Sequence, residues 1–85
     1  MIYIENNSLN QTPVKNIQFM LREINLYYNI LPEVIVDGIY DNQTKNAVMD
    51  FQERHSLPPT GIVDLDTFEK IAEEYNKALK NPIVP

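Results

Sequence analysis

The chain has 85 residues, with twelve acidic side chains against seven basic ones, a net charge of −5 and no cysteine. A chain of this length forms one domain, and without cysteine it has neither a disulfide framework nor a thiolate metal site. The basic residues are scattered along the sequence. Nucleic-acid binding rests on clustered Lys and Arg, so no nucleic-acid partner is expected.

The sequence also argues against a membrane partner. No apolar run approaches the roughly 20 residues that a membrane span needs. The opening residues, MIYIENN, lack the basic and long apolar regions of a secretory signal, so no signal peptide is expected in this chain. We expect a flexible lead-in over residues 1–11, a domain over residues 12–80, and a tail or linker stub over residues 81–85.

The first helix is predicted to begin at Thr12-Pro13, since Thr caps helices and Pro fits the first helical position. It is predicted to end at Leu31-Pro32, because the residue before proline is pushed out of the helical region. One face of this helix is apolar at a 3-4-3-4 spacing. Its members are Val14, Ile17, Leu21, Ile24 and Tyr28.

Residues 29–41 form a connection that is too apolar for a solvated loop, and we expect an extended segment that plugs one end of a bundle. Its apolar members are Val34, Ile35, Val36 and Ile39. A second helix is predicted from Asn42 to Arg54, with Ala47, Val48 and Phe51 facing inward.

A third helix is predicted from Leu65 to Leu79. Its apolar stripe consists of Phe68, Ile71, Ala72, Tyr75 and Leu79. Its outer face carries acid-first pairs at i,i+4, which are Asp66–Lys70 and Glu73–Lys77. The fold class is therefore expected to be all-α, a small three-helix bundle with an apolar extended connection between helices one and two.

Two stretches of the sequence repeat one phrase, Gly-Ile-x-Asp-x-x-Thr. They are VDGIYDNQT at residues 36–44 and PTGIVDLDT at residues 59–67, and they contain both glycines of the chain, Gly38 and Gly61. Each glycine is expected in a tight turn with positive φ. The isoleucines that follow, Ile39 and Ile62, are expected in the core.

The rest of the phrase predicts a helix start. Asp41 and Asp64 are expected as N-caps whose carboxylates accept from backbone N–H groups two or three residues on. Thr44 and Thr67 then occupy the third helical position, where a hydroxyl reaches back toward the cap. Val63 and Phe68 are spaced for a hydrophobic staple.

The repeated phrase gives little support for a metal site or a phosphate site. The calcium-loop spacing is absent from both copies, and His55 is the sole histidine, with no cysteine to join it in a zinc site. A phosphate cradle is also disfavoured, because no glycine-rich loop precedes either helix. No metal and no cofactor are expected.

Taken in order, these residues resemble the peptidoglycan-binding-like domain family, small three-helix modules appended to cell-wall hydrolases. The resemblance runs from about Val14 to Ile71. It is carried by Val14, Ile17, Gln18 and Leu21, then Val36-Asp37-Gly38-Ile39-Tyr40, Thr44, Ala47-Val48 and Phe51-Gln52, and finally Leu57-Pro58, Thr60-Gly61-Ile62-Val63-Asp64, Thr67 and Ile71.

The resemblance implies a non-catalytic module that binds peptidoglycan or a muropeptide and holds a linked or separate hydrolase at the wall. Location in the cell wall or outside the cell would follow if the module is exported within a larger protein.

Family members usually have glycine where this chain has Asp41. The Asp41 carboxylate is expected to accept the hydrogen bonds of the free backbone N–H groups at that helix start. No nucleophile–base pair stands out, and three short helices leave little room for a glycosidase cleft around acids such as Asp37 and Asp41. We therefore expect no enzyme.

Ligand contact is expected near the start of the second helix and the loop that faces it. The candidate residues are Tyr40, Asn42, Gln43, Gln52 and Thr60. Four of them have a structural alternative: Tyr40 as a plug, Asn42 and Gln43 as ordinary first-turn residues, and Gln52 as an amide that satisfies carbonyl groups.

An alternative function is protein docking or a pro-domain-like role in a wall, spore or phage assembly. A zinc-blocking pro-domain is disfavoured because it needs a cysteine. A monomer is expected.

Overall fold

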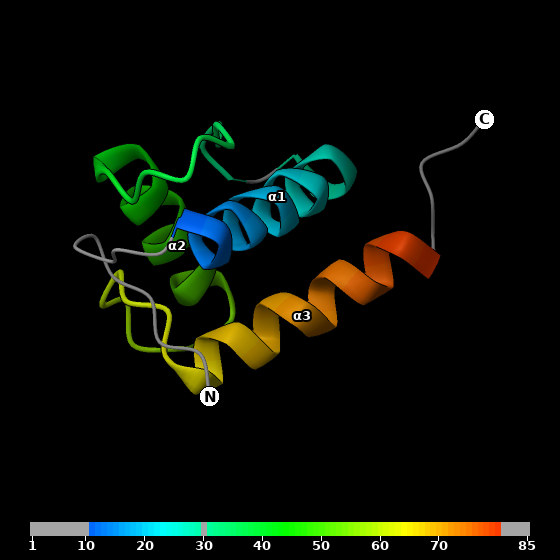
Figure 1. Cartoon of the computed structure of the whole chain (residues 1–85). Coiled ribbons are helices and arrows are strands. Elements are labelled where there is room, and N and C mark those ends of the chain that lie inside the picture. Colours follow the sequence, from blue (N-terminus) through cyan, green and yellow to red (C-terminus); the bar gives the residue numbers. More distant parts are fainter. Residues whose placement is uncertain (1–10, 30, 81–85) are drawn as a thin grey trace.

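The computed structural model describes residues 11–29 and 31–80, and their side chains from Pro13 onward. These residues form α1 (Gln11–Tyr28), α2 (Asn42–Arg54) and α3 (Leu65–Lys80), with no strand among them (Figure 1). The all-α fold predicted from the sequence is confirmed. Most of the predicted lead-in and the whole predicted tail lie outside the described residues.

Helix α1 differs from its prediction at both ends. It begins at Gln11, one residue before the expected cap Thr12, so that Pro13 still lies in the first turn, where its missing N–H costs nothing. It ends at Tyr28, because Asn29 takes a positive φ of 55° that asparagine tolerates. The chain therefore leaves the helix before it reaches Leu31-Pro32.

Helix α2 has the predicted bounds and ends through backbone hydrogen bonds. Ser56 adopts φ 61°, and its N–H donates to the carbonyl oxygen of Glu53 at 3.3 Å. The next N–H, of Leu57, donates to the carbonyl oxygen of Gln52 at 2.8 Å. This pair of bonds is the Schellman arrangement, which satisfies carbonyls at the end of a helix.

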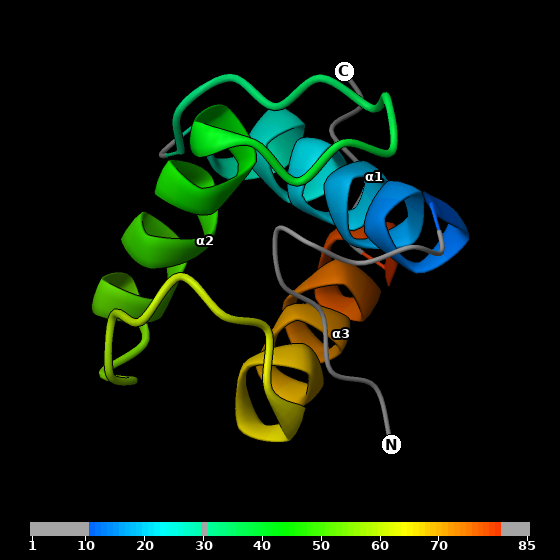
Figure 2. The ribbon, with the colours of Figure 1, turned by 60° about the vertical axis from the view of Figure 1, so that its left-hand side comes forward.

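The core lies between the three helices, with α1 packed against α3 and α2 facing both (Figure 2). The inward faces predicted for α1 and α2 are buried, apart from Tyr28, which is 38% exposed. The buried apolar residues are Val14, Ile17, Leu21, Ile24, Leu31, Val34, Tyr40, Ala47, Val48, Phe51, Val63 and Ile71.

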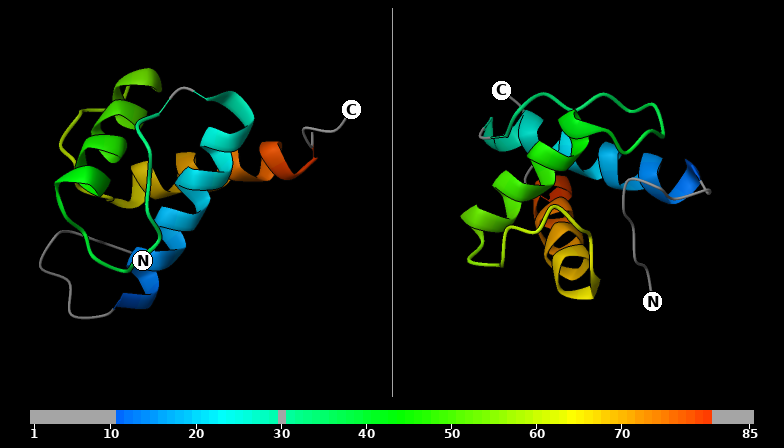
Figure 3. Two further views of the ribbon diagram at one scale, coloured as in Figure 1. Left: turned by 90° about the horizontal axis from the view of Figure 1, so that it is seen from above. Right: turned by 90° about the vertical axis from the view of Figure 1, so that its left-hand side faces the viewer.

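The connection between α1 and α2 is extended and runs back alongside α1 before it turns into α2 (Figure 3). Val34 plugs the core as predicted, but Ile35 and Ile39 are more than half exposed. The expectation that Ile39 and Ile62 fill the core is therefore wrong, since Ile62 is only half-buried. The residues that follow them do so: Tyr40 is 4% exposed and Val63 is fully buried. Successive side chains of an extended segment point to opposite sides, so an error of one position exchanges inside for outside.

Helix α3 follows the predicted stripe in part: Ile71 is fully buried as expected, but the buried line also includes two polar residues and leaves out Leu79. Thr67, Ile71 and Glu74 face inward, whereas Leu79 is 56% exposed. Phe68 and Tyr75 pack at the edge of the core. On the outer face, Lys70 pairs with Glu73 at 3.0 Å, and among the described residues no ion pair joins it to Asp66.

Candidate functional site

The first copy of the repeated phrase is held by a buried glutamine of α1. The Gln18 amide nitrogen donates to the Asp37 carboxylate at 3.0 Å, to the Ile39 carbonyl oxygen at 3.0 Å and to the Thr44 hydroxyl at 2.9 Å. Its amide oxygen accepts from the N–H groups of Asp37 and Gly38 at 3.0 and 2.8 Å. Gln18 is fully buried, so one side chain fixes the turn, the chain after it and the start of α2.

The second copy is held in the same way by Gln52 of α2. Its amide nitrogen donates to the Thr60 hydroxyl at 3.3 Å, the Ile62 carbonyl oxygen at 3.0 Å and the Thr67 hydroxyl at 3.0 Å. Its amide oxygen accepts from the Gly61 N–H at 2.9 Å. The sequence repeat is therefore a structural repeat: a glutamine on one helix clamps the turn that begins the next helix. We call these two arrangements the glutamine clamps.

Both clamped turns use a glycine with positive φ, 79° at Gly38 and 77° at Gly61. Residues with a Cβ rarely adopt this conformation. At Gly61 the space is also restricted, because an added Cβ would lie 2.7 Å from Cγ of Lys45 on α2. The two turns are joined by Tyr40, whose hydroxyl donates to the Gly61 carbonyl oxygen at 2.6 Å.

The aspartates of the two phrases cap their helices. The Asp41 carboxylate accepts from the Thr44 N–H at 3.2 Å, and the Asp64 carboxylate accepts from the Thr67 N–H at 2.9 Å. Hydrogen bonds from the N–H and then the hydroxyl of Thr67 hold the pKa of Asp64 below its ordinary value. The Thr44 hydroxyl, by contrast, donates to the Ile39 carbonyl oxygen at 3.4 Å. Both threonine hydroxyls also accept from a clamp glutamine, a contact that the sequence interpretation missed.

Asp37 is engaged within the first clamp. Its carboxylate accepts from the Ile39 N–H at 3.0 Å as well as from Gln18. The bond from Ile39, and then the bond from Gln18, hold the pKa of Asp37 below its ordinary value. A general acid needs the opposite shift, so this carboxyl is poorly suited to donate a proton near neutral pH.

The five predicted ligand residues divide into two groups. Tyr40 and Gln52 are buried and bonded within the domain, and Thr60 joins them around Gly61 through its bond to Gln52. Burial raises the pKa of the Tyr40 hydroxyl. Asn42 is exposed and Gln43 half-buried in the first turn of α2, and no described hydrogen bond joins either to the other three.

Surface cavities lined by described residues lie elsewhere on the domain. An apolar groove of about 330 Å³ between α1 and α3 is lined by Pro13, Asn16, Ile17, Phe19, Met20, Phe68 and Tyr75. A cavity of about 480 Å³ lies where α1 meets the extended connection, between Arg22 and Val34. The third, of about 290 Å³, is lined by Ile24, Tyr28, Arg54, His55 and Glu74, and we call it the Glu74 cavity.

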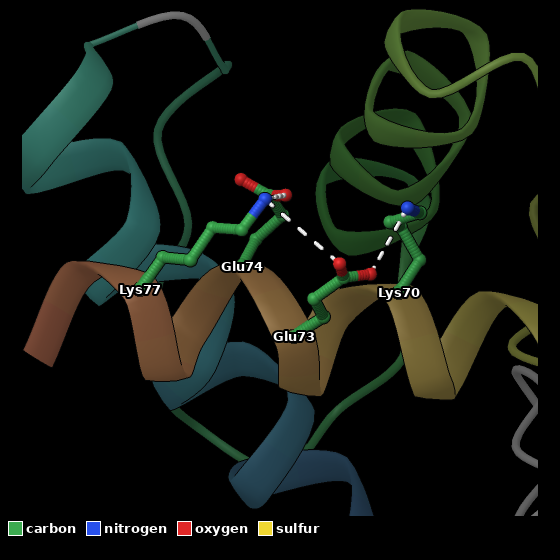
Figure 4. Close-up of polar contacts among 4 residues, drawn as sticks. All are labelled: Lys70, Glu73, Glu74 and Lys77. Atoms are coloured by element: carbon green, nitrogen blue, oxygen red, sulfur yellow. Dashed lines mark hydrogen bonds and ion pairs between the residues drawn. The ribbon is translucent and has the colours of Figure 1, made fainter. Parts of the chain in front are cut away.

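Glu74 is a residue of α3 that is only 8% exposed, and it lies next to the charged side chains of Lys70, Glu73 and Lys77 on the same helix (Figure 4). Lys77 donates to its Oε2 at 3.2 Å and lies 3.8 Å from Glu73. The hydrogen bond and charge of Glu74 raise the pKa of Lys77, and the bond from Lys70 lowers the pKa of Glu73. Sequence reasoning missed Glu74, although its place three residues after Ile71 puts it on the inward face of the helix.

Metal ligation finds little support in this geometry. Within residues 11–29 and 31–80, no three His, Asp or Glu side chains are grouped to hold a metal ion. His55 lies against the ring of Phe51, with ring centroids 4.2 Å apart, and burial lowers its pKa. Among the helices of the described part, none is long and apolar enough to cross a membrane.

Comparison with known protein families finds a match to one family model. The model of the family described as "Putative peptidoglycan binding domain" matches residues 10–71, more than half of the chain. The matched range contains both glutamine clamps and both capped helix starts. No curated protein and no solved structure matches the chain. The chain belongs to the peptidoglycan-binding domain family.

Proposed function

We propose that this domain is a non-catalytic module that binds peptidoglycan and holds a linked or associated hydrolase at the cell wall. The observation that carries the proposal is the family match, which spans the two glutamine clamps and the helix starts that they organise. Association with the cell wall follows from the same match. The hydrolase and the monomeric state are parts of the proposal.

The use of the carboxylates supports a binding role. Asp41 and Asp64 cap helices, and Asp37 is bonded to Gln18 and Ile39. Glycosidases pair two carboxyl groups across a cleft, one of them with a raised pKa. Here the pKa values of Asp37 and Asp64 are both lowered by hydrogen bonds from N–H groups.

We propose that wall contact near the clamps involves the solvent-accessible members of the predicted set, Asn42, Gln43 and Thr60. Their amide and hydroxyl groups suit a glycopeptide, which offers hydroxyls, acetamido groups and peptide bonds. Tyr40 and Gln52 would then act by positioning these residues, since their polar atoms bond to the Gly61 turn.

Co-sedimentation with insoluble peptidoglycan tests the proposal. Purified domain is mixed with sacculi, with and without wall teichoic polymers, at low and high salt. The domain is expected in the pellet at both salt concentrations. Its net charge of −5 makes removal of the anionic polymers neutral or favourable at low salt. A domain that stays in the supernatant under all four conditions is not a wall-binding module.

A second candidate function, protein docking, is favoured by the apolar groove between α1 and α3. Phe19 is 39% exposed there, and its ring meets that of Tyr75 edge-on with centroids 6.1 Å apart. Exposed aromatic side chains beside a groove are typical of protein interaction sites. Phe19→Ser separates the two functions: docking is weakened by this change, whereas wall binding near the clamps is retained. Loss of sacculus binding in a folded Phe19→Ser variant would assign the groove to the wall.

A further inference from the structure

The Glu74 cavity lies where the ends of α1 and α2 meet the middle of α3. Ile24 and Tyr28 come from α1, Arg54 and His55 from the end of α2, and Glu74 from α3. Glu74 lies beyond residue 71, where the family match ends, so this cavity includes a residue outside the matched range. Its volume of about 290 Å³ suits one small polar group.

Glu74 gives the cavity a carboxylate that is paired with Lys77. A buried carboxylate is costly unless it is paired and hydrogen-bonded. Lys77 supplies one bond at 3.2 Å. Tyr28 lines the same cavity, and desolvation and then the nearby Glu74 charge raise the pKa of its hydroxyl. A carboxylate has about four acceptor positions, so the bond from Lys77 leaves capacity for a ligand donor.

Arg54, the last residue of α2, gives the same cavity a positive charge. Its Nε donates to Asp50 at 3.1 Å, one turn earlier on α2. This bond orients the guanidinium, and its two terminal nitrogens carry further donors in the fork geometry that matches a carboxylate. His55 lines the same cavity, and burial lowers its pKa, so the imidazole adds a hydrogen-bonding group and no charge at neutral pH.

We propose that the Glu74 cavity binds a zwitterionic amino acid group of a peptidoglycan stem peptide, with its carboxylate on Arg54 and its ammonium on Glu74. Stem peptides present free carboxylates and, on their diamino acids, free ammonium groups. A glycan strand presents mainly neutral hydroxyl and acetamido groups, which offer no charge to either Arg54 or Glu74. The apolar carbons of the peptide would lie over Ile24 and the Tyr28 ring. The inference rests on the proposed wall binding and assigns this cavity to the peptide.

Nuclear magnetic resonance titration distinguishes peptide from glycan. The domain is titrated with a disaccharide that carries a diamino-acid tetrapeptide, and separately with the same disaccharide without its peptide. Backbone amide shifts are expected at residues 54, 55 and 74 with the peptide-bearing compound and not with the bare disaccharide. Equal shifts at these residues with the bare disaccharide would overturn the proposal, as would peptide-dependent shifts confined to Asn42, Gln43 and Thr60.

Charge-removing variants give the second test. Arg54→Gln and Glu74→Gln are each expected to weaken binding of the peptide-bearing disaccharide at least tenfold. The matched controls Arg22→Gln and Glu69→Gln remove exposed charges elsewhere and should stay within twofold of the unmodified domain. If Glu74→Gln does not fold by circular dichroism, Arg54→Gln decides alone, because its side chain is 45% exposed. Undiminished binding in folded Arg54→Gln overturns the proposal.

Co-sedimentation with sacculi keeps the two proposals distinguishable. If the unmodified domain pellets and the Arg54→Gln and Glu74→Gln variants pellet equally well, wall binding stands and the cavity proposal fails. If the unmodified domain itself remains in the supernatant, the proposed function fails and the inference fails with it. If pelleting falls in the Arg54→Gln and Glu74→Gln variants and not in the controls, the result supports wall binding and the cavity proposal together.

Discussion

The hydroxyl of Tyr40 donates to the carbonyl oxygen of Gly61 at 2.6 Å, and this bond joins the two copies of the repeated phrase. Tyr40 belongs to the first copy and Gly61 to the second, 21 residues later. Tyr40→Phe should lower the free energy of unfolding by about 1–3 kcal/mol, because a buried carbonyl oxygen loses its partner. Denaturant unfolding measures the change. Tyr27→Phe, at a half-buried position without a described hydrogen bond, is the control and should change stability little. A loss in Tyr40→Phe no larger than in this control would mean that the bond does not join the turns.

The glutamine clamps predict a larger loss. Gln52→Leu leaves the Gly61 N–H without its acceptor and removes a donor from the Thr67 hydroxyl and from the Ile62 carbonyl oxygen. The Ile62 carbonyl oxygen keeps the bond from the Asp64 N–H. An unsatisfied buried group costs about 1–3 kcal/mol and each other lost hydrogen bond about 0.5–1.5 kcal/mol, so the free energy of unfolding should fall by about 2–4 kcal/mol. Gln18→Leu should behave alike, because its contacts are equivalent. Gln43→Leu, in the first turn of α2, is the matched control and should stay within about 0.5 kcal/mol.

The cap at Asp64 predicts a smaller loss. Asp64→Ala removes the acceptor for the Thr67 N–H and should cost about 0.5–2 kcal/mol, measured by urea unfolding near neutral pH. Asp64→Asn retains a capping oxygen and should cost much less. Equal losses in the two variants would show that the cap does not carry the effect.

The same aspartate predicts a pH dependence. Its pKa in the folded domain is lowered from the ordinary value of 3.8, so folding favours the ionised form. The stability that it contributes is therefore complete above its unfolded pKa and is lost as the pH falls through the lowered native value. Asp37 titrates in the same direction. The difference in unfolding free energy between the unmodified domain and Asp64→Asn should thus shrink on acidification below about pH 4. A difference that stays constant over this range would contradict the assignment.

The end of α2 predicts a gain. Ser56 has φ 61° in the position where a Schellman ending usually has glycine. Left-handed geometry costs a residue with a Cβ about 1–2 kcal/mol, so Ser56→Gly should raise the midpoint of thermal unfolding. Ser56→Ala keeps the Cβ and should give no such gain. A lower midpoint in Ser56→Gly than in Ser56→Ala would contradict this geometry.

Much of the fold follows from local sequence signals. The bounds of α2 follow from Asp41 at its start and the polar, proline-rich linker after it, and the inward faces of α1 and α2 follow from spacing. The placement of Ile39 and Tyr40 does not follow, because alternation along an extended segment leaves two phases open. The hydroxyl bond to Gly61 makes Tyr40 the buried residue, and that partner is distant in sequence.

The candidate site was less predictable for the same reason. Gln18 and Gln52 were visible as letters of the family pattern, but their clamp geometry depends on turns that lie 20 and 9 residues later. Glu74 is charged, and hydrophobic spacing favoured Leu79 instead. Lys77 supplies a hydrogen bond to the Glu74 carboxylate, and the cavity around Glu74 is completed by residues of two other helices, among them Tyr28.

The most direct test of wall binding is a co-sedimentation isotherm of the unmodified domain on purified sacculi. The pelleted fraction is expected to rise with sacculus concentration, to saturate, and to fall when soluble muropeptides are added as competitors. A pelleted fraction that never exceeds the value without sacculi, at low and at high salt, would contradict it.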